Sequence, residues 1–176
     1  MASRSVEHHD LKLITFSTPL PAAEVIARLD KEVAKDKTPG KEFGAGEGFT
    51  SKQAIEDALN AGTGPGGLIY FTEFDHGKWL PYYQNPPFSK PATRTVFYDI
   101  GNPIIAETMI RHDIRASYNL PPRVLIVEKD NNEGTDVVYH QPSSVIDLKK
   151  DNPEMTAAAI RLDGIFEGIV SRITAV

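Results

Sequence analysis

In the stretch Phe97-Tyr98-Asp99-Ile100-Gly101-Asn102-Pro103, the end of an expected strand is followed directly by the start of an expected helix. Residues 94–100 are rich in the β-branched and aromatic side chains typical of a strand. Asn102 is suited to cap a helix, and Pro103 suits its first position because no hydrogen bond is lost there. We therefore predict a strand over 94–100 and a helix over 103–112, whose inner face is formed by Ile104, Ile105, Thr108 and Met109.

Similar patterns on both sides of this stretch predict the remaining elements. Hydrophobic alternation and turn residues indicate strands over 11–16, 68–74, 123–128 and 135–140, the last two forming a hairpin around the polar turn 130–134. Helical spacing indicates a helix over 21–36, a short one that Thr50 and Gln53 would cap and Gly62 would end, and one over 153–174. Pro21 is expected at the first helical position.

This order of elements predicts a single α+β domain. We expect a mostly antiparallel sheet of about four to five strands, with the helices packed mainly on one face. The chain divides into a flexible N-terminal tail over 1–10 and one domain over 11–176, in which the glycine-rich residues 38–67 are an expected insertion. The expected core contains Val25, Leu29, Val96, Leu125, Val127, Leu162 and Phe166.

The last helix carries a broad apolar stripe at alternating steps of four and three residues, formed by Met155, Ala159, Leu162, Phe166, Ile169 and Ile173. Such a stripe can cover a sheet face of its own chain or pack on a second subunit. The sequence alone leaves both uses open. We expect a homodimer, with the outer margin of this helix or an exposed sheet edge at the interface.

Composition excludes several classes of function. The 176 residues include 19 Lys and Arg against 24 Asp and Glu, a net charge of -5 that disfavours nucleic-acid binding and docking on anionic membranes. No apolar run approaches the length of about 20 residues that a membrane-spanning helix needs, and the N-terminus lacks the apolar segment of a secretory signal. The absence of cysteine excludes disulfides, thiol catalysis and zinc fingers. We expect a cytoplasmic protein without nucleic-acid or membrane partners.

Four short segments occur in an order that is typical of a known family. They are the strand end Asp75-His76, the strand–Gly-Asn-Pro–helix segment 97–103, a Leu-Pro followed by a strand over 120–128, and Tyr139-x-x-Pro142. Together they resemble the domain-of-unknown-function 302 family, and the resemblance covers residues 11–35 and 68–176. It implies a small α+β fold that is often dimeric. No general activity is established for the family, so the resemblance concerns the fold more than the function.

The chain differs from the family pattern in the enlarged, aromatic-rich region 38–93. Residues 38–67 are longer than the usual connection. The small-residue helix that normally follows the Asp-His pair is replaced by an aromatic and proline-rich segment containing Trp79, Tyr82, Tyr83 and Phe88. A connection of this length inside a compact domain is commonly functional or mobile.

The candidate for chemistry is His76, which opens directly into this aromatic segment. Histidine titrates near neutral pH and can act as a general acid or base, while aromatic rings bury apolar ligand surface. In this interpretation His76, Tyr82 and Tyr83 are catalytic, whereas Trp79 and Phe88 bind substrate. The structural alternative is that the aromatic residues cover a sheet edge and that His76 caps a turn through a backbone bond.

A second polar group lies around the end of the helix predicted over 103–112. His112, Arg115 and Tyr118, with the nearby Arg111, would suit a carboxylate or phenolate if they faced the loop of His76. The structural alternative is that the arginines complement the C-terminal end of the helix. Asp75 and Asp99 both end strands, and either could orient a histidine. Tyr139 and His140 are neighbours on one strand and face opposite ways.

Known catalytic motifs are missing from the sequence, which narrows the hypotheses to two. Histidine spacings of metal sites, a nucleophile elbow and a dinucleotide-binding fingerprint do not occur, so we expect neither metal nor nucleotide cofactor. The first hypothesis is a cofactor-independent isomerase, lyase or cyclase for a small organic molecule, with His76 as acid and base. The alternative is a non-catalytic, dimeric ligand-binding or scaffold domain.

Overall fold

The computed structural model describes residues 2–37, 49–83, 94–130 and 133–176, so Phe88 and residues 38–48 of the expected insertion lie outside the described residues. The strands are β1 (Leu13–Thr18), β2 (Ile69–Asp75), β3 (Thr95–Gly101), β4 (Arg123–Glu128) and β5 (Thr135–His140). The helices are α1 (Ala22–Glu32), α2 (Lys52–Gly62), α3 (Leu80–Tyr83), α4 (Pro103–Ile110), α5 (Pro142–Ile146) and α6 (Pro153–Thr174), and short 3₁₀ turns are η1 (Lys35–Lys37), η2 (His76–Lys78) and η3 (Ile114–Asn119).

The five strands form one sheet in the order β1-β5-β4-β3-β2, and every neighbouring pair is antiparallel. This confirms the expected single α+β domain with a mostly antiparallel sheet. The hairpin over β4 and β5 has the predicted bounds, and Gly134 in its turn has a φ of 104° that favours glycine. A side chain at that position would also meet the carbonyl oxygen of Thr18.

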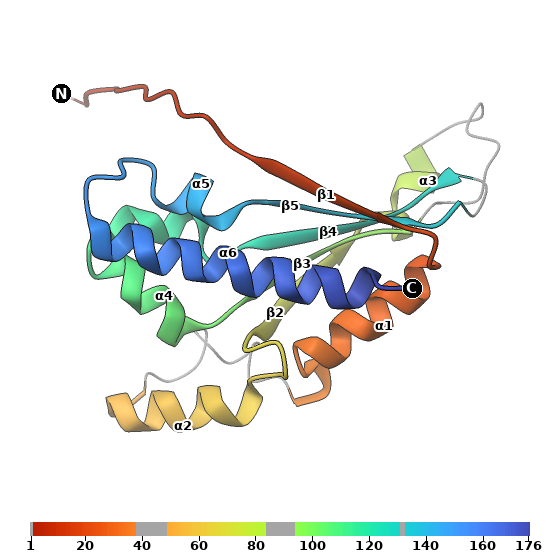
Figure 1. Ribbon diagram of the computed structural model, residues 1–176, viewed down its shortest axis with the longest axis horizontal. Coiled ribbons are helices and arrows are strands. Elements are labelled where there is room, and N and C mark those ends of the chain that lie inside the picture. Colours follow the sequence, from red (N-terminus) through yellow and green to blue (C-terminus); the bar gives the residue numbers. More distant parts are fainter. Residues whose placement is uncertain (1, 38–48, 84–93, 131–132) are drawn as a thin grey trace.

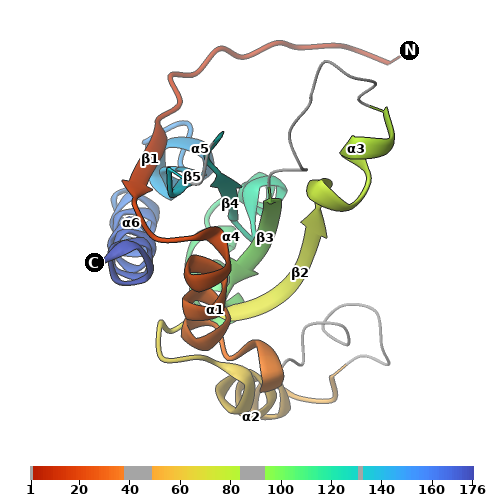
Figure 2. The ribbon, with the colours of Figure 1, turned by 90° about the vertical axis from the view of Figure 1, so that its right-hand side faces the viewer.

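Helices α1, α4 and α6 lie on one side of the sheet (Figures 1 and 2). The core lies between them and the sheet, where alternate strand residues such as Val96, Tyr98 and Ile100 are buried. Phe166 of α6 packs on Tyr139 of β5, with ring centres 5.7 Å apart. We call this side of the sheet the covered face and the opposite side the open face.

The apolar stripe of α6 is used inside the chain. Met155, Ala159, Leu162, Phe166, Ile169 and Ile173 are all buried in the core. Because these side chains already cover the sheet, the stripe does not provide a surface for a second subunit. The homodimer stays a prediction, and only other parts of the surface, such as the exposed Ile160, could support it.

The expected core is correct for five residues and wrong for two. Val25, Leu29, Val96, Leu162 and Phe166 are buried, whereas Leu125 and Val127 are only half-buried, and Val124 and Ile126 take their places in the core. Residues 124–127 form an unbroken apolar run, so their sequence contains no alternation that indicates which side faces inward. A shift by one residue moves every side chain to the other face.

Three expected local details are also corrected. Pro21 is the N-cap of α1 rather than its first helical residue, because its ψ of 146° is extended. The cap of α2 is Ser51 instead of Thr50, and its hydroxyl accepts a hydrogen bond from the Ala54 N–H. Of the four expected inner residues of α4, Met109 alone is fully buried. Within the described residues no helix is long and apolar enough to cross a membrane.

Candidate functional site

The open face of the sheet has an apolar row beside a polar row. Strand register places Phe74, Phe97, Leu125 and Val138 side by side across β2, β3, β4 and β5. The next row places Asp99 opposite Arg123. Phe74 is 47% exposed, and the other members of the apolar row are half-buried. Figure 2 shows that α1, α4 and α6 all lie on the other side, so the described helices leave the middle of this face accessible.

His76 joins the apolar row at the end of β2. Its imidazole lies 4.9 Å from the ring centre of Phe74, 5.8 Å from that of Trp79 and 5.9 Å from that of Phe97. Phe74 and Phe97 stack with ring centres 5.8 Å apart. We call these four residues the aromatic cluster. Local sequence explains part of it, because η2 turns the chain immediately after β2 and brings Trp79 back over His76.

The turn after β2 is capped by Asp75 rather than by His76. The Asp75 carboxylate accepts a hydrogen bond of 2.9 Å from the Gly77 N–H. Within the described part of the chain, the His76 imidazole has aromatic contacts but no hydrogen bond or ion pair. The structural alternative from the sequence, in which His76 caps the turn, therefore does not match this geometry.

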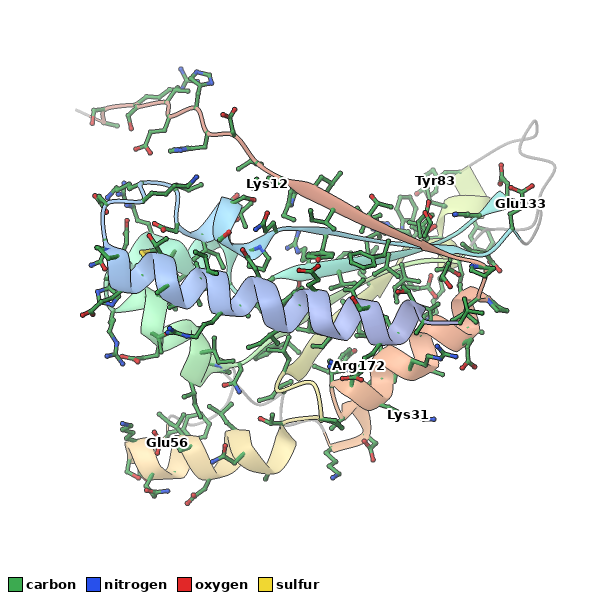
Figure 3. All side chains as sticks on the ribbon, viewed as in Figure 1. Lys12, Lys31, Glu56, Tyr83, Glu133 and Arg172 are labelled. Carbon is green, nitrogen blue, oxygen red and sulfur yellow. The ribbon has the colours of Figure 1, made fainter. Side chains whose placement is uncertain are left out.

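The two predicted tyrosines are placed differently with respect to the cluster. The ring of Tyr83 lies edge-on to that of Trp79, with centres 5.9 Å apart, and is 82% exposed. Tyr82 is 86% exposed and is not among the rings in contact with the aromatic cluster. Figure 3 shows Tyr83 on α3, at one end of the sheet.

His112, Arg115 and Tyr118 come together at the opposite end of the sheet. They line a cavity of about 790 Å³ between η3, the segment after α5 and the start of α6. Its lining does not include His76, and Figure 1 shows α3 and α5 at opposite ends of the sheet. The group of His112, Arg115 and Tyr118 and the aromatic cluster around His76 therefore do not share one pocket. The sequence alone had left this question open.

Within the second group, His112 and Arg115 already form hydrogen bonds or ion pairs with neighbouring side chains. Asn152 accepts two backbone hydrogen bonds as the cap of α6, which directs its Nδ2 group toward Nδ1 of His112 at 3.2 Å. Arg115 and Lys149 both bind Asp113, and these bonds hold the pKa of the Asp113 carboxyl well below its usual range. Tyr118 is 91% exposed. Most charges in this cavity are therefore already paired.

The acids at the strand ends do not orient a histidine. Asp99 accepts a hydrogen bond of 3.1 Å from Nε of Arg123. The Arg123 guanidinium in turn lies over the ring of Phe97, 5.2 Å from its centre. As expected from strand alternation, Tyr139 is buried and His140 is exposed on the open face.

Sequence reasoning did not identify a half-buried charged cluster that Asp30 of α1, Lys35 of η1 and Glu73 of β2 form around the Tyr98 hydroxyl. Lys35 binds Glu73 at 2.6 Å, lies near Asp30 at 3.4 Å, and donates to the Tyr98 hydroxyl at 3.2 Å. Burial is the largest single influence and raises the pKa of the Glu73 carboxyl, but hydrogen bonds with Lys35 and Tyr98 and the positive charges of Lys35 and Lys78 together outweigh it, so the net pKa is lowered. Burial and the neighbouring carboxylates raise the pKa of Tyr98. These groups satisfy one another on the covered face, so we assign them a structural role.

The signature residues around Gly101 also have structural roles. Asn102 caps α4 by accepting from the Ile104 N–H, and its amide donates to the Gly67 carbonyl. A side chain at position 101 would lie 3.1 Å from the Pro121 ring. The Gly-Asn-Pro and Leu-Pro segments thus pack against each other. Among the described residues, no group of three or more His, Asp and Glu side chains is arranged to hold a metal ion.

Comparisons with known proteins agree with this fold. The sequence model of the family described as "Domain of unknown function DUF302" matches residues 49–173. A solved structure described as "Crystal structure of uncharacterized conserved protein DUF302 from Bacillus stearothermophilus" is similar with a TM-score of 0.60 and 12% identity. The similarity covers 92% of this chain and 97% of that chain, and at this identity it shows the fold alone. No curated protein matches the sequence.

Proposed function

We infer that this chain, which belongs to the family described as domain of unknown function DUF302, binds a small organic molecule on the open face and transforms it with His76 as general acid and base. The reaction class is an isomerisation, elimination or cyclisation without metal or nucleotide cofactor. The observation that supports this proposal is the half-buried imidazole of His76, which touches three aromatic rings and has no hydrogen-bond partner within the described residues.

Shielding a polar side chain from water costs free energy. Buried or half-buried polar side chains are usually hydrogen-bonded, and one without a protein partner needs an explanation. Three rings with centres 4.9 to 5.9 Å from that of the imidazole restrict its orientation and reduce the water around it. A ligand placed on the apolar row would meet a histidine that is held in position and free to exchange a proton. Asp75 already caps the turn, so turn formation does not require the imidazole.

Trp79 and Tyr83 supply the further contacts of this proposal. Trp79 is 39% exposed and presents part of its indole for stacking on the ligand. The Tyr83 ring lies against Trp79, so Tyr83 is the phenol that we expect to stabilise a developing negative charge on oxygen. Tyr82 is more exposed and its ring is not among those in contact with the cluster, so we expect it to contribute less.

Ligand binding can be tested with the single tryptophan of the chain. Trp79 is the one Trp in the sequence, so its fluorescence reports on the aromatic cluster. We expect members of a panel of small aromatic and alkenyl acids, ketones and amides to raise the melting temperature saturably and to change Trp79 fluorescence. Trp79→Ala should weaken binding by about 1 to 3 kcal/mol, measured by calorimetry, as expected for one stacked ring. Ligands that bind the Trp79→Ala variant with unchanged affinity would contradict this site.

Catalysis is tested separately on the ligands that bind. Proton NMR in D₂O should show exchange of an acidic C–H or conversion to an isomer with the wild-type protein. His76→Gln should keep the fold and the binding but lose the exchange. His8→Gln is the matched control, because His8 is an exposed histidine of the N-terminal segment that lies outside the cluster. Binding without any exchange in the wild-type protein would favour the non-catalytic alternative, and full exchange in His76→Gln would place the base elsewhere.

The alternative function is a dimeric binding or scaffold domain without chemistry. It is favoured by exposed apolar residues outside the core, including Phe74 and Leu13 on the open face and Ile160 on α6. A second copy that covered the open face would explain the same apolar row without a ligand. Light scattering of dilute protein decides this point. A monomer mass excludes the dimer, and a dimer that Phe74→Asp dissociates would assign the open face to self-association.

A further inference from the structure

We propose that the ligand of the open face carries an anionic group, a carboxylate or an enolate, and that Arg123 binds it. This inference rests on the proposed function and adds the chemical class of the ligand. It follows from the position of Arg123 beside the aromatic cluster, from the contacts that hold its guanidinium, and from the polar groups around it.

The Arg123 guanidinium has two described contacts. Its Nε donates to Oδ1 of Asp99 at 3.1 Å, and its central carbon lies over the Phe97 ring, 5.2 Å from the ring centre. The side chain is nevertheless 72% exposed. The one described hydrogen bond of this guanidinium uses Nε, which leaves the two terminal amino groups for a ligand. A guanidinium fixed in this way loses less entropy when it forms a bidentate bond to a carboxylate.

Phe97 connects this cation to the candidate base. The His76 imidazole lies 5.9 Å from the centre of the Phe97 ring, and the Arg123 guanidinium lies 5.2 Å from the same centre. A planar molecule beside Phe97 can therefore reach His76 with one part and Arg123 with another. The stacked Phe74 extends the apolar support under such a molecule.

The polar row beyond Arg123 adds further donors. A cavity of about 390 Å³ is lined by Arg123 together with Tyr118, His140 and Asp99. Asn119 also lines it, but its amide is already bonded to the Val145 carbonyl. Tyr118 and His140 can donate to an anion there. Asp99 offsets part of the positive charge, so we expect a preference for anions that is moderate in size.

The arrangement also suits the proposed chemistry. When His76 removes a proton from a carbon next to a carbonyl group, the C–H bond breaks and its electron pair moves onto the carbonyl oxygen as an enolate. A cation at the far end of the conjugated system stabilises that negative charge. Returning the proton from the imidazolium to a different carbon completes an isomerisation without any further reactant. Along the open face, the base His76 is thus followed by the apolar support Phe97 and then by the cation Arg123.

The test compares two probes of equal shape. Cinnamate carries a carboxylate on a planar apolar body, and cinnamamide replaces it with a neutral amide. We expect the wild-type protein to bind cinnamate about fivefold more tightly than cinnamamide, which corresponds to about 1 kcal/mol for an exposed but held ion pair. Titration followed by Trp79 fluorescence gives both affinities. The difference should shrink at high salt, because salt screens exposed charges.

Arg123→Gln should remove the difference between the two probes and leave the affinity for cinnamamide unchanged. The matched control is Arg161→Gln, which makes the same change of charge at an exposed position of α6. It should leave both affinities as they are. A cinnamate preference that persists in Arg123→Gln overturns this inference.

The outcomes separate the inference from the function on which it rests. If Trp79→Ala weakens both probes but Arg123→Gln changes neither, the open face is the binding site and only the assignment of Arg123 fails. If both probes bind equally well to Trp79→Ala, or neither binds the wild-type protein at millimolar concentration, the proposed function fails together with the inference.

Discussion

The two faces of the sheet use the same strands for different purposes. On β3, Val96, Tyr98 and Ile100 face the helices and are buried, whereas Phe97 and Asp99 alternate with them on the open face. The covered face is filled by apolar side chains from α1, α4 and α6. The open face instead presents an apolar row, a polar row and a histidine without a hydrogen-bond partner among the described residues.

The difference indicates where each kind of substitution acts. Residues of the covered face determine stability, because they lose most of their contact with water on folding. Residues of the open face keep part of that contact, so folding alone does not account for a row of aromatic rings there. Stability measurements on matched pairs from the two faces can therefore test whether the open face is as accessible as the structure indicates.

The largest expected effect comes from paired phenylalanine substitutions. Phe166→Ala on the covered face removes a fully buried ring, and we expect a loss of about 3 to 5 kcal/mol in the free energy of unfolding. Phe97→Ala on the open face should cost clearly less, about 1 to 2 kcal/mol, since Phe97 is half-buried. Urea denaturation measures both. Equal losses would mean that the open face is covered in solution, with a second copy as the obvious cover.

Adjacent residues of β4 give a smaller but more local contrast. Ile126 is fully buried, whereas its neighbour Val127 is half-buried on the open face. Ile126→Ala should cost about 2 to 4 kcal/mol and Val127→Ala about 1 kcal/mol or less. The same denaturation experiment checks both variants. A larger loss for Val127→Ala would reverse the assignment of the two faces and restore the order expected from the sequence.

The fold could be predicted wherever the signal is local. Asn102 and Pro103 start α4, Asn152 starts α6, and the polar turn with Gly134 makes the hairpin, because each depends on residues a few positions apart. The faces of Leu125 and Val127 could not be predicted, since a continuous apolar run has no period. Neither α5 nor η3 was expected. The start of α5 is held by Asp163 of α6, which bonds Gln141 and Ser143 from a distant part of the chain.

Only the central residues of the candidate site could be predicted from the sequence. His76 and Trp79 are close in sequence, so a histidine among aromatic rings was visible there. Phe97 and Arg123 come from other strands, and their place beside His76 follows from strand register. His112 and Arg115 were grouped correctly with each other, but no local signal showed that they lie at the other end of the sheet. The bond between Lys35 and Glu73 is likewise long-range.

Charged pairs on the two faces should respond differently to acid. Burial alone would raise the pKa of Glu73, but the bonds with Lys35 and Tyr98 and the nearby lysine charges together lower it on folding, so Glu73 stabilises the fold above its ordinary pKa of about 4.5. This contribution is lost as the pH falls through the lower pKa of the folded state. Glu73→Gln should cost about 1 to 2 kcal/mol at pH 7, and the difference from wild type should diminish below pH of about 4.5.

The matched substitution on the open face is Asp99→Asn, which breaks the bond to the 72% exposed Arg123. It should cost about 0.5 kcal/mol or less at pH 7, as is usual for exposed ion pairs. Chemical denaturation at several pH values measures both variants. An Asp99→Asn loss as large as that of Glu73→Gln would contradict the view that the open face is accessible to water.

The smallest expected difference within a pair is that between Trp79 and Tyr82, which follow one another closely after β2. Trp79 is 39% exposed and contacts His76 and Tyr83, so Trp79→Ala should lower the free energy of unfolding by about 1 kcal/mol. Tyr82 is 86% exposed, and Tyr82→Ala should change it by about 0.5 kcal/mol or less. Denaturation followed by circular dichroism avoids the loss of the single tryptophan signal. If Trp79→Ala costs as much as Phe166→Ala, the indole belongs to a core and not to a ligand surface, and its exposed part would then need a protein partner.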